Sequence, residues 1–263
     1  MTGPIALTPL DLLVAASLIG LNAALSLWLG LGLERKLLVA SVRTVVQLTL
    51  LGYLLVPVFA LHQPLIVFGM LAVMVTLAGR EAVSRTERRF AGMVPSAFLA
   101  MTLGAGATAL IGTAIIGVDP WWEPRYLIPL VGMILGNALT GVSLGMDRCT
   151  ALLDDNRDRV DTLLAMGATR WEAARPIAAE AARTGMIPIL NAMSAVGLVT
   201  IPGMMTGQIL GGTDPVEAAL YQVLIMFLIA AAVAIGVGAS VMLTVRALFD
   251  DEHRLRPERL SKR

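Results

Sequence analysis

VDTLLAMGATRWEAARPIAAEAART, from Val160 to Thr184, is rich in alanine and in charge, and its pattern is that of two polar helices. GMIPILNAMSAVGLVTIPGMMTGQILGG follows directly, from Gly185 to Gly212, and contains no charged residue. Pro188, Pro202 and several glycines are expected to interrupt this second part. A polar helical segment therefore leads straight into an apolar segment that is broken.

The composition of the whole chain is that of a membrane protein. Hydrophobic residues make up 57% and charged residues 15% of the 263 residues, whereas soluble domains carry roughly 25% charged residues. The net charge of +1 gives no sign of a nucleic-acid partner. The sequence predicts an all-α fold, a polytopic transmembrane helix bundle in which residues 1–263 form a single domain within the lipid bilayer.

Apolar stretches of about 20 residues, enough to cross a hydrocarbon core, recur along the chain. They predict about seven spans, at residues 8–31, 37–59, 63–79, 92–116, 126–147, 184–210 and 217–248. The 20 Lys and Arg residues, except Arg43 and Arg125, all fall in alternate loops or at the C-terminal end. The positive-inside rule then predicts the N-terminus outside and the C-terminus inside, with loop 148–183 and the basic tail 249–263 in the cytoplasm. The first residues lack the basic start of a cleavable signal, so the first span is expected to be retained.

The loop 148–183 predicts a cytoplasmic helix–Gly–helix elbow. No Gly or Pro falls between Met146 and Met166, so the fifth span is expected to continue as a helix beyond the membrane. Gly167 is placed to end this helix in the left-handed conformation, and Thr169 with Glu172 has the capping-box spacing that starts the next helix. Two interpretations stay open: an amphipathic hairpin lying on the lipid surface, or a docking elbow on which a cytosolic motor acts.

The sixth predicted span is expected to be broken at Pro202. Pro202 lacks a backbone donor and would clash with the carbonyl of Leu198, and broken helices at membrane depth recur at transport sites. The thioethers of Met204 and Met205 suit soft cations such as Cu(I), whereas iron(III) or aluminium favours carboxylates; flexible packing is the alternative role for methionine. The candidates for a translocation path near the break are Asn191, Met193, Pro202, Gly203, Met204 and Met205.

Two other patterns lie within the predicted spans. Arg43 and Gln47 form a polar pair one helical turn apart, which predicts either a gate facing the bundle interior or an anchor reaching the cytoplasmic surface. Glycines four residues apart predict close contact between helices, because helices in lipid associate by packing. These glycine pairs are Gly132 with Gly136, Gly141 with Gly145, and Gly203 with Gly207.

Several motifs resemble known transporter families. DTLLAMGATRWEAA is similar to the coupling segment of ABC-transporter permeases, with Asp161 at its Glu position and Gly167 at its Gly position. Thr162 and Leu163 replace the two alanines of that segment, and Glu180 stands where a proline is expected. The wider chain resembles the FetB-type family of metal-export permeases, which includes plant aluminium-tolerance membrane subunits. The motifs that carry this resemblance are Arg43-x-x-x-Gln47-Leu48 with Gly52-Tyr53-Leu54, IPLVGMILGNAL from Ile128 to Leu139, MGAT from Met166 to Thr169, and GLVTIPGMMTGQILGGTDPVEAALYQ from Gly197 to Gln222.

The resemblance implies the membrane subunit of an ABC transporter, a multi-pass protein of the inner (plasma) membrane that exports a metal ion, with iron favoured. It implies a homodimer of permease chains and a separate cytosolic ATPase subunit. It places the coupling contacts at Asp161, Gly167, Ala168, Thr169, Trp171 and Glu172, and Asn137 is a further candidate for the path.

The sequence agrees with an ATPase on another chain, because no G-x-x-x-x-G-K-[ST] phosphate loop occurs in it. We therefore expect ATP on the partner subunit, no cofactor in this chain, no catalytic residue and no enzyme activity. The alternative function is an ATP-independent carrier or channel for a small solute, with the cytoplasmic hairpin lying on the membrane. The identity of the substrate and the direction of transport stay open.

Overall fold

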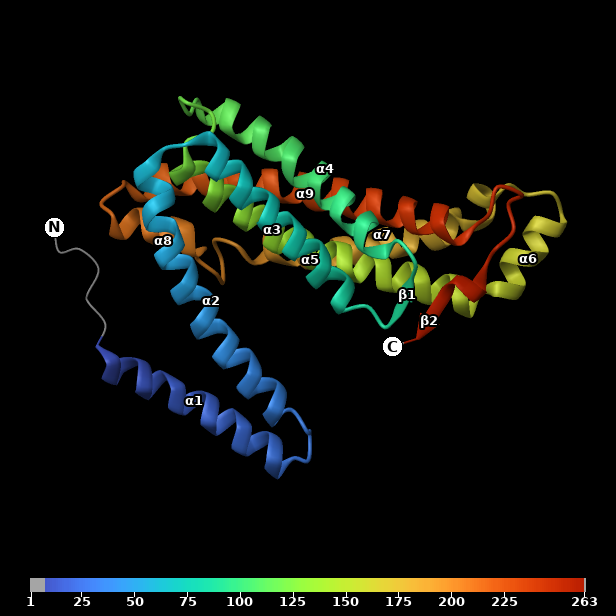
Figure 1. Ribbon diagram of the computed structural model, residues 1–263, viewed down its shortest axis with the longest axis horizontal. Coiled ribbons are helices and arrows are strands. Elements are labelled where there is room, and N and C mark those ends of the chain that lie inside the picture. The colour runs from blue at the N-terminus through green and yellow to red at the C-terminus, as the bar shows by residue number, and fades with distance from the viewer. Residues whose placement is uncertain (1–7, 263) are drawn as a thin grey trace. The chain divides into compact units, whose positions relative to one another are not determined.

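The computed structural model of the protein describes residues 8–262, which contain nine α-helices, one 3-10 helix and two short strands (Figure 1). The elements are α1 Pro9–Trp28, α2 Glu34–Leu61, α3 Pro64–Ser84, β1 Arg88–Phe90, α4 Met93–Ile116, α5 Pro124–Asp155, α6 Arg157–Ala165, α7 Arg170–Ala195, α8 Gly203–Leu210, α9 Pro215–Leu248, η1 Pro257–Arg259 and β2 Leu260–Lys262. Contacts group them into two units, residues 8–63 with 210–212, and residues 64–209 with 213–262. The single domain over 1–263 stays a prediction.

The first unit is built on the hairpin of α1 and α2. Thr8 and Asp11 form a capping box that starts α1: the Thr8 N–H donates to Asp11 Oδ2 at 2.8 Å. Ser26, buried near the end of α1, closes the turn to α2, because its Oγ accepts from the Leu33 N–H at 2.9 Å and donates to Glu34 Oε2 at 3.1 Å. Each helix is long and apolar enough to cross a membrane.

The core of the second unit lies where α9 packs against α4, α5 and α7. Small residues allow these helices to approach closely. A Cβ on Gly104 of α4 would lie 2.6 Å from the Ala232 carbonyl oxygen of α9. A Cβ on Gly185 of α7 would lie 2.7 Å from the Gly141 carbonyl oxygen of α5. The predicted close contact at Gly141 is therefore confirmed, whereas a Cβ on Gly203 or Gly207 would meet nothing within 4 Å.

Six helices among the described residues are long and apolar enough to span a membrane: α1, α2, α3, α4, α5 and α9. The all-α polytopic bundle is thus confirmed, but the sixth predicted span, residues 184–210, is not one helix. Its first part is the end of α7, which runs through both Pro176 and Pro188, and its last part is α8. The first half of α7 carries the charged residues of the predicted elbow.

Charged segments that are distant in sequence meet at one end of the second unit, which we call the charged end (residues 85–90, 147–183 and 249–262; Figure 1). Strand β1, after α3, pairs antiparallel with β2 at the end of the chain. Arg88 binds α5 through Asp154 Oδ2 at 2.9 Å and Asp155 Oδ1 at 3.1 Å. The loop after α3, the loop 148–183 and the tail therefore lie together, as the charge pattern predicts. That this end lies on the cytoplasmic side of the membrane stays a prediction.

The fifth span was expected to continue as one helix to Met166, but the structure interrupts it. α5 ends at Asp155 and α6 begins at Arg157, on either side of Asn156, whose φ is −111° and ψ 29°. The Asn156 side chain donates to the Leu152 carbonyl at 2.8 Å. Asn competes in this way with regular helical geometry, so the helix is interrupted even though neither Gly nor Pro is present.

Candidate functional site

The predicted elbow is formed by the end of α6 and the start of α7. Gly167 has a φ of +92°. Its N–H donates to the Leu164 carbonyl at 2.9 Å, and the Ala168 N–H donates to the Leu163 carbonyl at 3.0 Å. This pair of bonds is the Schellman ending, which satisfies carbonyls that a helix terminus leaves free. The left-handed helix end predicted at Gly167 is confirmed.

The predicted capping box at the start of α7 is also confirmed. The Thr169 N–H donates to Glu172 Oε2 at 2.8 Å, and the Glu172 N–H donates to Thr169 Oγ1 at 3.4 Å. The backbone N–H of Thr169, followed by its hydroxyl, holds the pKa of the Glu172 carboxyl below its usual value. The elbow is therefore a defined turn, in which each helix end is satisfied by its own residues.

The elbow presents apolar side chains at the charged end. Met166 is 79% exposed and Trp171 is 43% exposed, on either side of Gly167. Asp161 is also exposed, and Ala168 is half-buried. The apolar side chains of Met166 and Trp171 are therefore available for another protein to cover.

Several contacts fix the elbow to the rest of the unit. Arg148 of α5 forms an ion pair with Glu180 of α7, and the Arg170 N–H donates to His253 Nδ1 of the tail at 3.4 Å. The tail is itself folded, with Phe249 and Leu255 buried. These tail contacts have no local sequence signal, since His253 and Arg170 lie far apart in the chain.

The break in the predicted sixth span is a compact turn at residues 196–202. α7 ends at Ala195, whose carbonyl accepts from the N–H groups of Val199 at 2.9 Å and Thr200 at 3.2 Å. Gly197 follows with a φ of +80°, and its N–H donates to the Thr200 carbonyl at 2.9 Å. Backbone groups in hydrocarbon need internal partners of this kind.

The predicted role of Pro202 in this break is wrong. The helix has already ended before Leu198, so Pro202 has no helical carbonyl to clash with there. Instead the Pro202 carbonyl accepts from the Thr206 N–H at 3.0 Å, at the start of α8. Proline is tolerated at a helix start because its missing N–H has no helical partner to lose.

A pocket of about 380 Å³ lies between this turn, α8 and the first part of α9. Gln222 of α9 is 7% exposed and lines the pocket, and its side-chain oxygen has no hydrogen-bond donor in the part of the chain that the structure describes. The other lining residues are apolar or, in the case of Thr200, a hydroxyl. They are Met193, Val196, Gly197, Thr200, Ile201, Pro202, Met205, Ala219, Val223, Met226 and Phe227.

The structure brings three of the predicted path residues, Met193, Pro202 and Met205, together at this pocket. Met204 and Gly203 are neighbours in sequence but do not line it. Asn191 is exposed on α7.

The remaining path candidates are not among the residues that line the pocket. Asn137 on α5 donates to the Met133 carbonyl of its own helix at 2.9 Å. Arg43 and Gln47 lie on α2 in the first unit, both exposed, and their role in a path stays a prediction.

The chemistry of the pocket does not match a hard metal ion. Its lining, within residues 193–227, includes no carboxylate and no histidine. Over residues 8–262 no group of three or more His, Cys, Asp or Glu residues is placed to hold a metal. Of the two weak metal candidates, only Met205 reaches the pocket.

Gln222 and Met226 were not among the predicted site residues. A signal for Gln222 exists, because it is the one side-chain amide in the apolar helix Pro215–Leu248, and buried amides usually have hydrogen-bond partners. Met226 has no such signal, since methionine is common in apolar cores.

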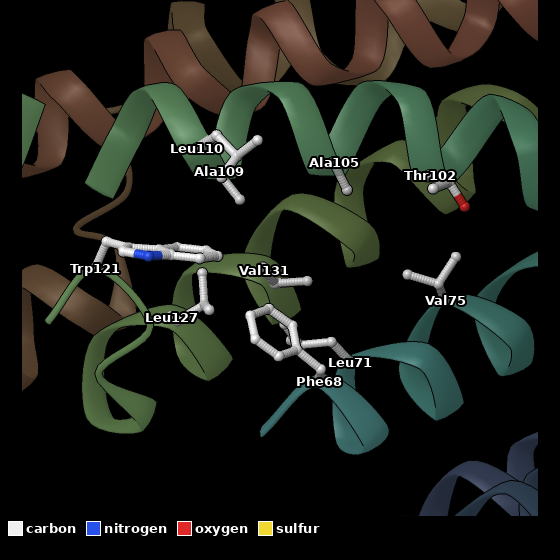
Figure 2. Close-up of a pocket in the computed structure, with 11 residues that line it drawn as sticks. Phe68, Leu71, Val75, Thr102, Ala105, Ala109, Leu110, Trp121, Leu127 and Val131 are labelled. Carbon is white, nitrogen blue, oxygen red and sulfur yellow. The ribbon is translucent and has the colours of Figure 1, made fainter. Parts of the chain in front are cut away.

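A second pocket, of about 310 Å³, lies between α3, α4 and α5 (Figure 2). Trp121 lies at the left of the view and Phe68 below its middle (Figure 2), and the centroids of their rings are 5.6 Å apart. Thr102 is its one hydroxyl-bearing residue, and Thr102 Oγ1 donates to the Phe98 carbonyl at 2.8 Å. This lining, within residues 68–131, contains no charged side chain and no side-chain amide.

GVSLG at residues 141–145 matches the letters of the G-x-S-x-G pattern of serine hydrolases. That motif requires a sharp turn from a strand to a helix that exposes the serine. Here Ser143 is 5% exposed in the middle of α5, and Gly141 lies against α7 and α9. The two glycines therefore serve helix packing.

Comparison with known proteins gives relatives over most of the chain. The chain is 41% identical over 215 residues to "UPF0014 membrane protein slr1647" of Synechocystis sp., covering 81% of this chain and 82% of that protein. It is 29% identical over 233 residues to "Probable iron export permease protein FetB" of Escherichia coli, covering 89% of each chain. It is 32% identical over 215 residues to "UPF0014 membrane protein STAR2" of Oryza sativa, covering 81% of this chain and 73% of that protein.

No solved structure matches this chain. A family model described as "Uncharacterised protein family (UPF0014)" matches residues 9–249. This range takes in every candidate span, the elbow and the pocket at Gln222. Together with the helical bundle and its membrane-protein relatives, the match shows that this chain is a polytopic membrane protein of the UPF0014 family.

Proposed function

We propose that this chain is the membrane-spanning subunit of an ABC transporter, driven by ATP hydrolysis on a separate cytosolic subunit. The observation that carries the proposal is the elbow at the charged end. Its turn is fixed by the Schellman ending at Gly167 and the capping box at Thr169. Met166 and Trp171 expose apolar surface beside it, where an ATPase subunit would bury them.

The geometry supports a route from the elbow to the pocket. α7 has 26 residues, which corresponds to about 39 Å of helix at 1.5 Å per residue. It begins at the elbow and ends at Ala195, where the turn that lines the pocket begins. Between these ends Gly185 packs directly on Gly141 of α5 and on Val237 of α9. A push on the elbow would tilt α7 about this contact and move the wall of the pocket.

The location, the assembly and the cargo belong to the same proposal. A charged end that holds most of the Lys and Arg residues and faces the cytoplasm fits a plasma (inner) membrane protein. Two permease chains would surround one path, and the likeness to a probable iron export permease favours a metal ion, iron in particular, as cargo. With ATP bound by the partner, this chain is a transport subunit with no enzyme activity of its own.

The test uses the full chain purified from its native membranes and reconstituted in vesicles with the ATPase that co-purifies. We expect the chain to stimulate ATP hydrolysis and to move radioactive iron only when ATP is supplied. Iron movement at the same rate without ATP would instead identify the ATP-independent carrier. Absence of any co-purifying ATPase and of any stimulation would overturn the proposal.

Gly167→Val tests the elbow itself. A Cβ at this position would meet nothing within 4 Å, so the substitution acts through the positive φ alone. A strain of about 1–2 kcal/mol for a β-branched residue in this conformation should reduce ATPase stimulation by roughly tenfold while the chain still inserts. Gly167→Asn is the matched control, because Asn adopts this conformation more readily. Normal stimulation by Gly167→Val would show that the hairpin only rests on lipid.

A further inference from the structure

His253 of the C-terminal tail caps the first turn of α7. The Arg170 N–H, the first of this helix, donates to His253 Nδ1 at 3.4 Å. The first four N–H groups of a helix have no partner within that helix, and the tail supplies one here. A backbone N–H is always a donor. His253 Nδ1 therefore carries no proton in this contact, and the imidazole is neutral, with its proton on Nε2.

His253 lies at the tip of a turn, residues 250–254, whose base is fixed. Its φ of +61° is a left-handed conformation, which His adopts more readily than most residues. At the base of the turn Phe249 and Leu255 are buried and pair with each other. The Asp250 carboxylate shapes the turn, because it accepts from two backbone N–H groups of the turn itself, at 2.7 and 3.0 Å. The tip is therefore able to leave α7 without unfolding of the tail.

Protonation of His253 removes the contact and replaces it with repulsion. An imidazolium has no lone pair to accept from the Arg170 N–H. It also places a positive charge at a helix N-terminus, where the macrodipole is already positive. Two side chains in the first turn of α7 are charged. The guanidinium of Arg170 adds to the repulsion, whereas the carboxylate of Glu172 opposes it but is already bound by the N–H and hydroxyl of Thr169.

The other charges near His253 do not alter this balance. Residues 166–169, which precede α7, carry no charge. The charged residues of the turn move with His253, so they interact with an imidazolium equally in both positions of the tip. They are Asp250, Asp251, Glu252 and Arg254. The charge of His253 thus decides whether the tip rests on α7.

We propose that the contact of His253 with the start of α7 is a pH-sensitive link between the tail and the elbow. Histidine is the side chain that ordinarily changes charge between about pH 5 and 8. Neutral His253 holds the tip of the turn docked on α7, and protonated His253 releases it. The released state leaves the Arg170 N–H without its cap. One consequence rests on the proposed transport function: acidification loosens the elbow and lowers its coupling to the ATPase.

A pair of spin labels measures docking directly. The labels are placed on cysteines at Asp251, exposed on the turn, and at Asp158, exposed on α6, in the purified full chain in detergent. Measurements are made at about pH 7.5 and about pH 5.5, near the two ends of the range in which histidine titrates. We expect one narrow distance distribution at the higher pH. At the lower pH the ratio of released to docked tips should be about fivefold higher, as loss of one hydrogen bond implies.

Two substitutions should fix the link in opposite states. His253→Asn keeps a side-chain acceptor, does not titrate and tolerates the left-handed backbone, so the tip should stay docked at both pH values. His253→Arg is always charged and has no acceptor, so the tip should be released at both. The proposal is wrong if the wild type shows no response to pH, or if His253→Asn responds as the wild type does.

ATPase stimulation in vesicles tests the consequence for the elbow. The fall in stimulation between the higher and the lower pH should be larger for the wild type than for His253→Asn, because the ATPase's own pH dependence is common to both. Equal falls would contradict the role in coupling. The spin-label measurements contain neither ATP nor a partner. They therefore judge the link even if the chain stimulates no ATPase, and failure of the link leaves ATP-dependent transport standing.

Discussion

At the scale of single residues, a few glycines decide how closely the helices of the second unit approach. Gly104, Gly141 and Gly185 each have the backbone of another helix where a Cβ would lie, at 2.6–2.9 Å. Such contacts matter in a membrane, where lipid removes the hydrophobic drive between helices. Gly136, by contrast, has nothing within 4 Å, so spacing alone does not identify a packing glycine.

Gly104→Ala is expected to destabilise the bundle by about 1–3 kcal/mol, because the new methyl group would press on the Ala232 carbonyl of α9, and backbone yields little. Gly106→Ala on the same helix is the control, since nothing lies within 4 Å of its Cβ. It should leave stability equal or slightly higher, as Ala favours helix over Gly. Denaturant unfolding in detergent measures both, and equal losses in the two variants would contradict the packing argument.

At the scale of elements, α7 is a helix bounded by two glycine turns. Gly167 precedes it with a φ of +92° and Gly197 follows it with a φ of +80°. Each turn satisfies its own backbone groups. α7 is therefore one continuous helix with a defined turn at each end. The proposed transmission of movement from the elbow to the pocket requires such a helix.

Pro202→Ala is expected to leave the break unchanged, because the helix ends at Ala195 by the turn at Gly197 and not by proline. Gly197→Val should disturb it, since a β-branched residue is strained at a φ of +80°. Spin labels at Leu190 and Gly207 report the distance across the break. If Pro202→Ala shifts this label-to-label distance toward about 26 Å, the length of a continuous helix over these residues, then Pro202 does cause the break.

At the scale of the whole molecule, the charged end collects four segments that the chain visits in turn. The loop after α3, the end of α5, the elbow and the tail are joined there by strand pairing and ion pairs. Asp250 illustrates this order: the Arg254 N–H, followed by the Arg256 guanidinium, holds the pKa of its carboxyl below the usual value. The tail is thus a folded part of this end.

The predicted orientation places this charged end in the cytoplasm. Cysteine at Asp158, exposed on α6, should resist a membrane-impermeant thiol reagent in intact cells, and cysteine at Asp119, exposed between α4 and α5, should react. The native Cys149 is fully buried, so its background is low. Labelling at Asp158 from outside would reverse the topology.

The local features of the fold could be predicted from the sequence alone. The helix end at Gly167, the capping box of Thr169 with Glu172, six of the seven predicted spans and the clustering of charge each depend on residues a few positions apart or on summed composition. The membrane imposes the length of spans and the asymmetry of charge directly on the sequence. For this reason the fold class and the elbow could be predicted.

Only the tertiary structure decided which residues share a site. Met193 and Gln222 lie far apart in the chain and on different helices, yet they line one pocket, while Met204, next to Met205, does not. The position of the break also followed from the turn at Ala195 rather than from the nearest proline. Such choices depend on which helix faces pack together, and packing is set by contacts between distant segments. The spacing of Gly141 and Gly145 predicts a close contact, but not that Gly185 of α7 is its partner.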